Sequence, residues 1–296
     1  NIWQSMRVAL RGITANKLRA FLTMLGIIIG VGAVIALLSV GRGVQDEITR
    51  QLQSTGSNLI TIVGGSLRTS GVRVSTSSSS SRQLTTKDAA AIIAAGLPEV
   101  AAVSPEFGTS GQVSYGNQSS FVQITGVTPD YQFVRNAGLA AGEFFDNSHI
   151  EGVAQVAVLG HSIAAALFGD EDPVGKIIKL NRSNYRVLGV LEERGGSSFT
   201  SEDSAVFVPL TTAQRRLIGA TLGYGTAQRL STIAVSAVNE ASVDAAVAAI
   251  DQVLREQHRL ADDDAADFTI ISQKLILSVV GQVTGILTAF LGAIAA

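Results

Sequence analysis

The chain has 296 residues and carries 22 Lys and Arg against 24 Asp and Glu, which gives a formal net charge of -2. This balance lacks the strong basic surface of a nucleic-acid-binding protein and excludes that class. Cysteine is absent, which excludes disulfides, thiol catalysis and cysteine-ligated metals. Residues 42–274 lie between two long apolar runs and are numerous enough to bury a core without such cross-links.

The first apolar run, residues 20–41, contains no charged side chain and is bracketed by Arg19 and Arg42. The second run, residues 275–296, is equally free of charge and follows Lys274. About 20 apolar residues, at 1.5 Å per residue, span the roughly 30 Å hydrocarbon layer of a bilayer. We therefore expect two transmembrane helices, 20–41 and 275–296. A cleaved signal peptide and a buried helix of a soluble enzyme are the alternatives for the first run.

The charges beside the first run predict its orientation. Its N-terminal flank is basic and its far flank is mixed: Arg7, Arg11, Lys17 and Arg19 precede the run, whereas Arg42, Asp46, Glu47 and Arg50 follow it. The positive-inside rule then places the N-terminus in the cytoplasm and residues 42–274 outside it. Residues 1–19 are expected to be a cytoplasmic amphipathic leader that lies in the membrane surface or extends the helix. Because the chain begins without Met and ends inside an apolar run, we expect it to be part of a longer protein.

The region between the runs predicts alternating strands and helices. The first part should contain a stalk helix over 44–53, a strand over 59–63, a serine-rich surface loop over 74–81, a helix from Thr85 to Gly96 opened by a capping box with Asp88, and a strand over 100–105. The middle part should contain strands over 153–159, 177–180, 185–191 and 205–208 and a short helix over 163–168. The last part should contain a strand over 232–237, a helix with the apolar stripe Val243, Val247, Ile250 and Leu254, and a strand over 268–271.

The order of these elements predicts the domain organisation. Strand–helix–strand units at both ends flank a middle section with its own strands. We expect an α+β extracytoplasmic domain of two subdomains inserted between two transmembrane helices, with a mostly antiparallel or mixed sheet. One subdomain, with the stalk, comprises 42–130 and 210–274, and the second, 131–209, is inserted into it.

One short motif resembles a catalytic site. The sequence GHSIA, residues 160–164, follows a strand and opens a helix, which is the place of a serine nucleophile elbow, although alanine replaces the closing glycine. A catalytic triad would need His149 or His258 as the base and an acidic residue after it, and neither has a convincing local context in the sequence. The favoured interpretation is that Ser162 caps the helix.

Three other patterns suggest binding sites only weakly. The sequence GDEDPVGK, residues 169–176, has the wrong glycine spacing for a phosphate-binding loop, and Ile177 stands where Ser or Thr would hold magnesium. The acidic clusters 170–172 and 262–264 lack the alternating spacing of a calcium loop and are interpreted as solvated turns. The three histidines are too scattered for zinc. We therefore expect no catalytic, cofactor-binding or metal residue in this chain.

Small residues form one face of each apolar run. In the first run Gly26 and Gly30 form a G-x-x-x-G pattern, and in the second Gly281 and Gly285 form another, with Gln282 beside them. Such glycines let helix backbones approach closely, and a glutamine at lipid depth seeks a partner on another helix. We expect these five residues to make helix-packing contacts. The alternative is that glycine is simply common in membrane spans.

Four longer segments resemble a known family. They are ALRGITANKLRAFLTMLGIIIGVGAVIALLSVGRG at 9–43, ITGVTPDYQFVRNAGLAAGEFFD at 124–146, VAVLGHSIAAALFGDEDPVGKIIKL at 156–180 and VFVPLTTAQRRL at 206–217. The first segment is similar to the first span of MacB-like ABC transporter permeases, which are part of the larger FtsX-like group. The other three segments are similar to the periplasmic core domain of that family.

The resemblance implies a noncatalytic permease subunit in the bacterial inner membrane. It implies a homodimer with four spans per subunit, and an ABC ATPase, fused or separate, that holds ATP and magnesium outside this chain. ATP hydrolysis in the cytoplasm then moves the extracytoplasmic domain, and the family exports macrolides, peptides or siderophores, extracts lipoproteins or controls cell-wall hydrolases. The resemblance leaves open the substrate and whether a periplasmic adaptor takes part. The alternative classes are a two-span sensory receptor and, more distantly, a membrane-tethered serine hydrolase.

Overall fold

The computed structural model describes residues 3, 17–55, 58–65, 83–194, 202–218, 229–261, 264–276, 278–279, 281–283 and 285–286. The serine-rich segment 74–81 and most of the leader lie outside these residues. The chain divides into two compact units, one made of Asn1–Arg50 with Ile276–Ala296 and the other of Gln51–Leu275.

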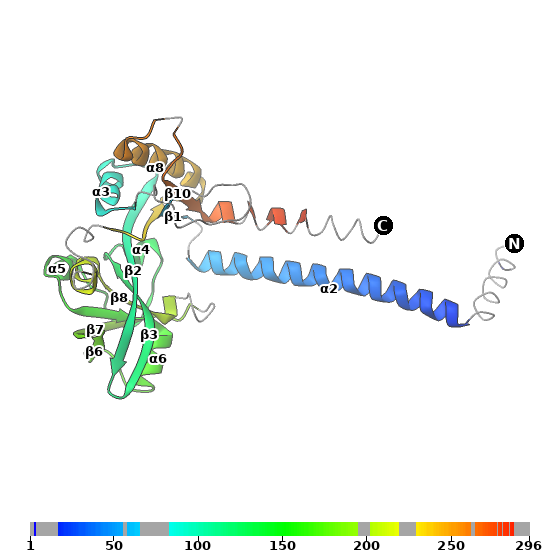
Figure 1. Ribbon diagram of the computed structural model, residues 1–296, viewed down its shortest axis with the longest axis horizontal. Coiled ribbons are helices and arrows are strands. Elements are labelled where there is room, and N and C mark those ends of the chain that lie inside the picture. Colours follow the sequence, from blue (N-terminus) through cyan, green and yellow to red (C-terminus); the bar gives the residue numbers. More distant parts are fainter. Residues whose placement is uncertain are drawn as a thin grey trace. The chain divides into compact units, whose positions relative to one another are not determined.

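Helix α2 covers Lys17–Thr55 without interruption, 39 residues in all (Figure 1). It includes the stalk helix expected over 44–53, and that prediction is confirmed. Apolar side chains such as Phe21 and Ile28 are exposed on α2 in the single chain. Among the residues that the structure describes, no helix is both long enough and apolar enough to cross a membrane. The structure therefore does not confirm the spans expected over 20–41 and 275–296.

The unit Gln51–Leu275 is built on a ten-stranded sheet in the order β10-β1-β9-β2-β3-β8-β5-β7-β4, with β6 beside β2 and β7. The strands are β1 Leu59–Gly64, β2 Val100–Tyr115, β3 Gln118–Val127, β4 Leu139–Gly142, β5 Val156–Leu159, β6 Ile177–Leu180, β7 Ser183–Leu191, β8 Ala205–Pro209, β9 Thr232–Ala237 and β10 Phe268–Ser272. The pairs β3–β8 and β5–β7 are parallel, and the remaining pairs of these strands are antiparallel. The mixed α+β sheet agrees with the sequence prediction.

Short helices connect and cover these strands. They are α3 Thr86–Ala94, α4 Tyr131–Val134, α5 Asn147–Glu151, α6 His161–Phe168, α7 Leu210–Thr212 and α8 Val243–His258, with the 3-10 turns η1 Glu202–Ser204 and η4 Glu240–Ser242 and the π-helix η2 Ala213–Ile218. The predicted capping box of α3 is present, because the side chain of Asp88 accepts a hydrogen bond from the backbone N–H of Thr85 at 2.7 Å.

Strand β2 is long enough to belong to two parts of the sheet. Its first part pairs with β9, from Val100↔Ala237 to Glu106↔Thr232, and its second part pairs with β3, starting at Phe107↔Gly126. We call β10, β1, β9, the first part of β2, α3 and α8 the α3–α8 half. The second part of β2 with β3 to β8 and α6 is called the α6 half. Both lie along β2 in Figure 1.

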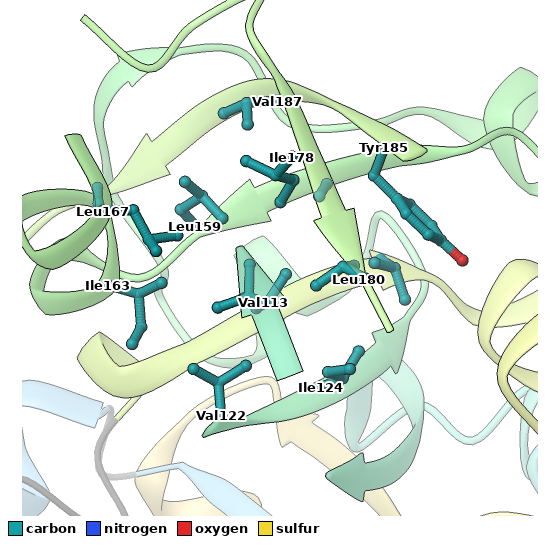
Figure 2. Close-up of a cluster of buried hydrophobic side chains, with 14 of the residues drawn as sticks. Val113, Val122, Ile124, Leu159, Ile163, Leu167, Ile178, Leu180, Tyr185 and Val187 are labelled. Carbon is teal, nitrogen blue, oxygen red and sulfur yellow. The ribbon is translucent and has the colours of Figure 1, made fainter. Parts of the chain in front are cut away.

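Each half has its own apolar core. In the α3–α8 half, the helices α3 and α8 bury residues such as Ile92, Ile250 and Leu254 against the strands. In the α6 half, Figure 2 shows Val113, Leu159 and Ile178 directed into a shared core. A further cluster in the α6 half surrounds the buried rings of Tyr131, Phe145 and Phe207.

The structure contains elements beyond the predicted ones. Most expected strands and helices occur, but β3, β4, α4, α5 and α7 are not among them, and β2 continues to Tyr115 instead of ending at Pro105. The core of the α6 half also includes Val113, Val122 and Ile124, which precede residue 131. Residues 51–275 form one compact unit, so the two-subdomain architecture is not confirmed. The boundaries at 131 and 209 stay a prediction.

Candidate functional site

The structure gives the GHSIA motif a packing explanation. Helix α6 begins at His161, its N-cap is Gly160, and no side chain caps it, so the prediction that Ser162 caps the helix is wrong. The cap is a glycine because η1 lies against it. A Cβ built on Gly160 would lie 2.3 Å from the backbone oxygen of Glu202 and 2.5 Å from that of Asp203.

The two histidines considered as catalytic bases have other partners. His149 Nδ1 lies 2.7 Å from the carboxylate of Asp146, which is the N-cap of α5. His258 is buried in the α3–α8 half, with Nδ1 2.6 Å from Asp267 and Nε2 3.3 Å from Asp88. The described contacts place neither histidine on Ser162, and a serine triad is not supported.

The segment 169–176 is a turn, as predicted. Gly169 and Gly175 have positive φ angles of 59° and 82°, and the carboxylate of Asp172 accepts a hydrogen bond from the backbone N–H of Val174 at 3.0 Å. A salt bridge joins Lys176 to Glu171 across it. Within the described residues, no group of three or more His, Cys, Asp or Glu side chains is placed to hold a metal ion.

The residues expected to pack helices are open in the part of the chain that the structure describes. Among those residues, a Cβ built on Gly26, Gly30, Gly281 or Gly285 would meet nothing within 4 Å, and Gln282 is exposed. Contacts with a second copy or with other spans would involve residues outside this chain. The packing role of these five residues therefore stays a prediction.

The most distinctive polar feature of the described residues is a buried ion pair at the middle of β2. Arg135, which follows α4, donates from Nε and from Nη2 to the two carboxylate oxygens of Glu106, at 2.9 Å each. Only 9% of the Glu106 side chain and 19% of the Arg135 side chain are exposed. Such bidentate pairs are strong and directional.

A second ion pair extends this arrangement. Arg194, which follows β7, donates from Nη1 to Glu202 of η1 at 2.7 Å. Its Nη2 donates to the backbone oxygens of Arg135 and Asn136, and the Glu202 carboxylate is hydrogen-bonded to the hydroxyl of Tyr131. We call Glu106, Tyr131, Arg135, Arg194 and Glu202 the β2 ion network.

Burial and charge shift the titration of this network. Burial raises the pKa of Glu106, although the adjacent Arg135 opposes the shift. Burial would lower the pKa of Arg135, but the carboxylate of Glu106 outweighs it and the pKa is raised. Burial, together with the negative charges of Glu202 and Glu106, raises the pKa of Tyr131 well above its ordinary value. The arginine therefore stays charged and the phenol stays neutral at physiological pH.

A hollow of about 260 Å³ lies beside the first residues of β2. Its walls come mainly from apolar side chains of α3 and β2, including Ile92, Ile93 and Leu97, and Asp130 is the charged residue that lines it. This lining offers too few polar groups to position a polar substrate.

Comparison with known proteins identifies the class. The profile of the MacB-like periplasmic core domain matches residues 20–253. The macrolide export ATP-binding/permease protein MacB of Chlorobaculum tepidum is 38% identical over 88% of this chain and 39% of its own length. The MacB protein of Bdellovibrio bacteriovorus is 31% identical over 96% of this chain and 42% of its own length. The chain thus spans about two fifths of the length of these relatives.

Two solved structures share the fold. The periplasmic region of MacB from Actinobacillus actinomycetemcomitans aligns with a TM-score of 0.63 at 22% identity, covering 79% of this chain and 98% of that one. The extracellular domain of the ABC-type transporter YknZ from Gram-positive bacteria aligns with a TM-score of 0.54 at 17% identity, covering 72% and 100%. The chain therefore shares its fold with the periplasmic region of that MacB protein and with the extracellular domain of YknZ. The chain belongs to the MacB-like family of ABC transporter permeases.

Proposed function

We propose that this chain is the permease subunit of a mechanotransmitting ABC transporter, which couples ATP hydrolysis in the cytoplasm to movement of an extracytoplasmic domain. Its substrate class is a macrolide, a peptide or a lipoprotein, to be exported or extracted. ATP and magnesium belong to the partner ATPase, and the permease works as a homodimer. A periplasmic adaptor protein is a further partner to be tested.

The continuity of α2 carries the proposal. This single helix reaches from Lys17 to Thr55, and β1 begins only at Leu59. A helix is stiff along its axis, so a displacement at its N-terminal end is passed to the sheet. The second expected span enters at the neighbouring strand, because β1 pairs with β10 and Ile60 is opposite Ser272. Both apolar runs therefore attach to adjacent strands of one sheet.

The proposed topology places 20–41 and 275–296 in the inner membrane, with the N-terminus cytoplasmic and residues 42–274 outside. This chain has no natural cysteine, so a single introduced cysteine reports one position once the cysteines elsewhere in the transporter have been replaced. In spheroplasts of cells that express the complete transporter, a membrane-impermeant maleimide should label a Lys87→Cys variant. It should label a Lys17→Cys variant only after the cells are permeabilised. Labelling of Lys17→Cys in intact spheroplasts would overturn the proposed orientation.

The mechanical part of the proposal needs a separate measurement. Spin labels on Lys87→Cys, one in each copy of the dimer, should report different distances in the nucleotide-free and vanadate-trapped transporter. A variant of the partner ATPase that binds but does not hydrolyse ATP is the control, because it should not form the vanadate-trapped state. Equal distances in both states would contradict the relay.

A further inference from the structure

We infer that the β2 ion network is a rigid joint that makes the α3–α8 half and the α6 half of residues 51–275 move as one body. The inference rests on the proposed function for its purpose, because a relay of movement needs a stiff outer domain. The joint itself is a property of this chain and can be measured without transport.

The position of Glu106 is the first argument. Glu106↔Thr232 is the last pair between β2 and β9, and Phe107↔Gly126 is the first pair between β2 and β3. Glu106 therefore stands where the strand leaves one half and enters the other. A crossing of this kind, where β2 continues from one half into the other, is a natural place for bending.

Apolar side chains also pack across this crossing. The buried residues of the two main cores are different residues, but Phe107 packs against both, and Leu210, which follows β8 of the α6 half, is buried in the core of the α3–α8 half. Dispersion contacts hold each half together but have little angular preference. The ion network adds directional interactions at the crossing to those of Ser231, which donates its backbone N–H to the backbone oxygen of Glu106 and accepts from the Gly108 N–H, at 2.9 Å each.

The network joins four separate segments of the chain. Glu106 lies in β2, Tyr131 and Arg135 lie in or next to α4, Arg194 follows β7, and Glu202 lies in η1. The helix α4 packs Val134 against Leu59 and Ala234 of the α3–α8 half, whereas Tyr131 packs against Phe207 of the α6 half. A rotation between the halves would therefore stretch the Arg135–Glu106 hydrogen bonds. Arg194, held by Glu202 within the α6 half, ties the end of α4 to that half through the backbone oxygens of Arg135 and Asn136.

Burial makes such stretching costly. The side chains of both ion pairs are at most 22% exposed, so water has little access to replace a broken bond. A charged group that loses its partner in such surroundings carries the full cost of desolvation. The network therefore resists bending much more than an exposed salt bridge does.

The test is a distance measurement within the full chain. Spin labels on Lys87→Cys in α3 and Ala166→Cys in α6 report one distance across the crossing, since both positions are exposed and the chain has no natural cysteine. Pulsed electron spin resonance on the full chain in detergent then gives the width of the distance distribution. Glu106→Gln is the test variant. Glu171→Gln and Asp251→Asn are matched controls, because each removes an ion pair that lies within a single half.

We expect a distribution at least about twofold wider in Glu106→Gln than in the unsubstituted chain, and no widening in either control. Circular dichroism establishes that each variant is folded. If Glu106→Gln does not fold, Tyr131→Phe replaces it, since this change removes only the hydroxyl bonded to Glu202 and should also widen the distribution. Equal widths in the folded test variant and the controls would overturn the joint. The proposed relay of movement is tested separately, by the distances between the two copies in the nucleotide-free and vanadate-trapped transporter.

Discussion

The guanidinium of Arg135 faces the carboxylate of Glu106 through two hydrogen bonds of 2.9 Å, although the two residues belong to different elements and are 29 positions apart. The strand that carries Glu106 also carries the apolar residues Val103 and Val113 into two different cores. One long strand and one buried ion pair thus share the same crossing. The strand connects the two halves through the backbone, and the ion pair adds hydrogen bonds of fixed geometry at the same point.

Loss of the Glu106 charge should destabilise the domain. Glu106→Gln leaves Arg135 buried without its anionic partner, and the expected loss is roughly 2 to 4 kcal/mol in the free energy of unfolding. Chemical denaturation of the full chain in detergent, followed by circular dichroism, measures it. Glu171→Gln breaks a solvent-exposed pair and should cost much less, because water replaces the lost contact. Equal losses in the two variants would mean that burial of the Glu106–Arg135 pair has no special weight.

The glycine before α6 should not tolerate a side chain. In Gly160→Ala the new Cβ would collide with the backbone of η1 at Glu202 and Asp203. Either η1 moves, which would disturb Glu202 in the ion network, or the strain stays, with an expected loss of about 1 to 3 kcal/mol. Ser162→Ala is the control in the same helix turn, where an exposed side chain should change stability by less than about 0.5 kcal/mol. The same denaturation experiment compares them.

A fluorophosphonate probe tests the chemistry of the same motif. Because Ser162 has no described contact with His149 or His258, we expect no covalent labelling at Ser162. Mass spectrometry of the treated chain, with Ser162→Ala as the reference, measures it. Specific labelling of Ser162 would revive the hydrolase alternative.

The elements that the sequence predicts well are those whose pattern is local. Strands β6 and β9 occur with the expected ends, because each is a short run of mostly apolar and small residues that can be recognised without the rest of the chain. The capping box at Thr85 depends on two residues only, and it too is present.

The second part of β2 and the whole of β3 could not be predicted in this way. Residues 108–121 read GTSGQVSYGNQSSF and contain few apolar residues. They form strands because they pair with one another over nine residue pairs, from Phe107↔Gly126 to Tyr115↔Gln118, and because Val113 and Val122 are buried in a core built from later segments. The β2 ion network was missed for a similar reason. Its members come from four segments, and no local pattern brings them together.

The carboxyl group of Asp146 should titrate well below its ordinary pKa. The Ser148 hydroxyl donates to it at 2.6 Å, and His149 contacts it through both its ring and its backbone N–H. These hydrogen bonds lower the pKa of Asp146 from 3.8 to about 2. A depressed pKa means that the carboxylate stabilises the folded state above pH 3.8, and this contribution is lost as the pH falls through about 2.

Carbon-13 NMR of the aspartate carboxyl groups measures this titration. Ser148→Ala removes the first of these hydrogen bonds and should raise the pKa of Asp146 toward 3.8. A pKa that is the same in both proteins would show that the hydroxyl does not stabilise the charge.

The small faces of the two apolar runs should matter for coupling rather than for folding of the outer domain. In the complete transporter, Gly30→Leu or Gly285→Leu places a bulky side chain where helix backbones are expected to touch. Helix association should weaken by roughly 1 to 2 kcal/mol, because close backbone packing is lost. The outer domain has separate cores and should keep its melting temperature.

Gly32→Leu is the matched control, since Gly32 lies on a different face of the same helix from Gly26 and Gly30. Cysteine cross-linking between spans and stimulation of the partner ATPase are the measurements, and both should fall in the test variants but not in the control. If Gly30→Leu and Gly285→Leu behave like Gly32→Leu in both assays, these glycines face lipid, and the packing prediction fails together with the coupling route that depends on it.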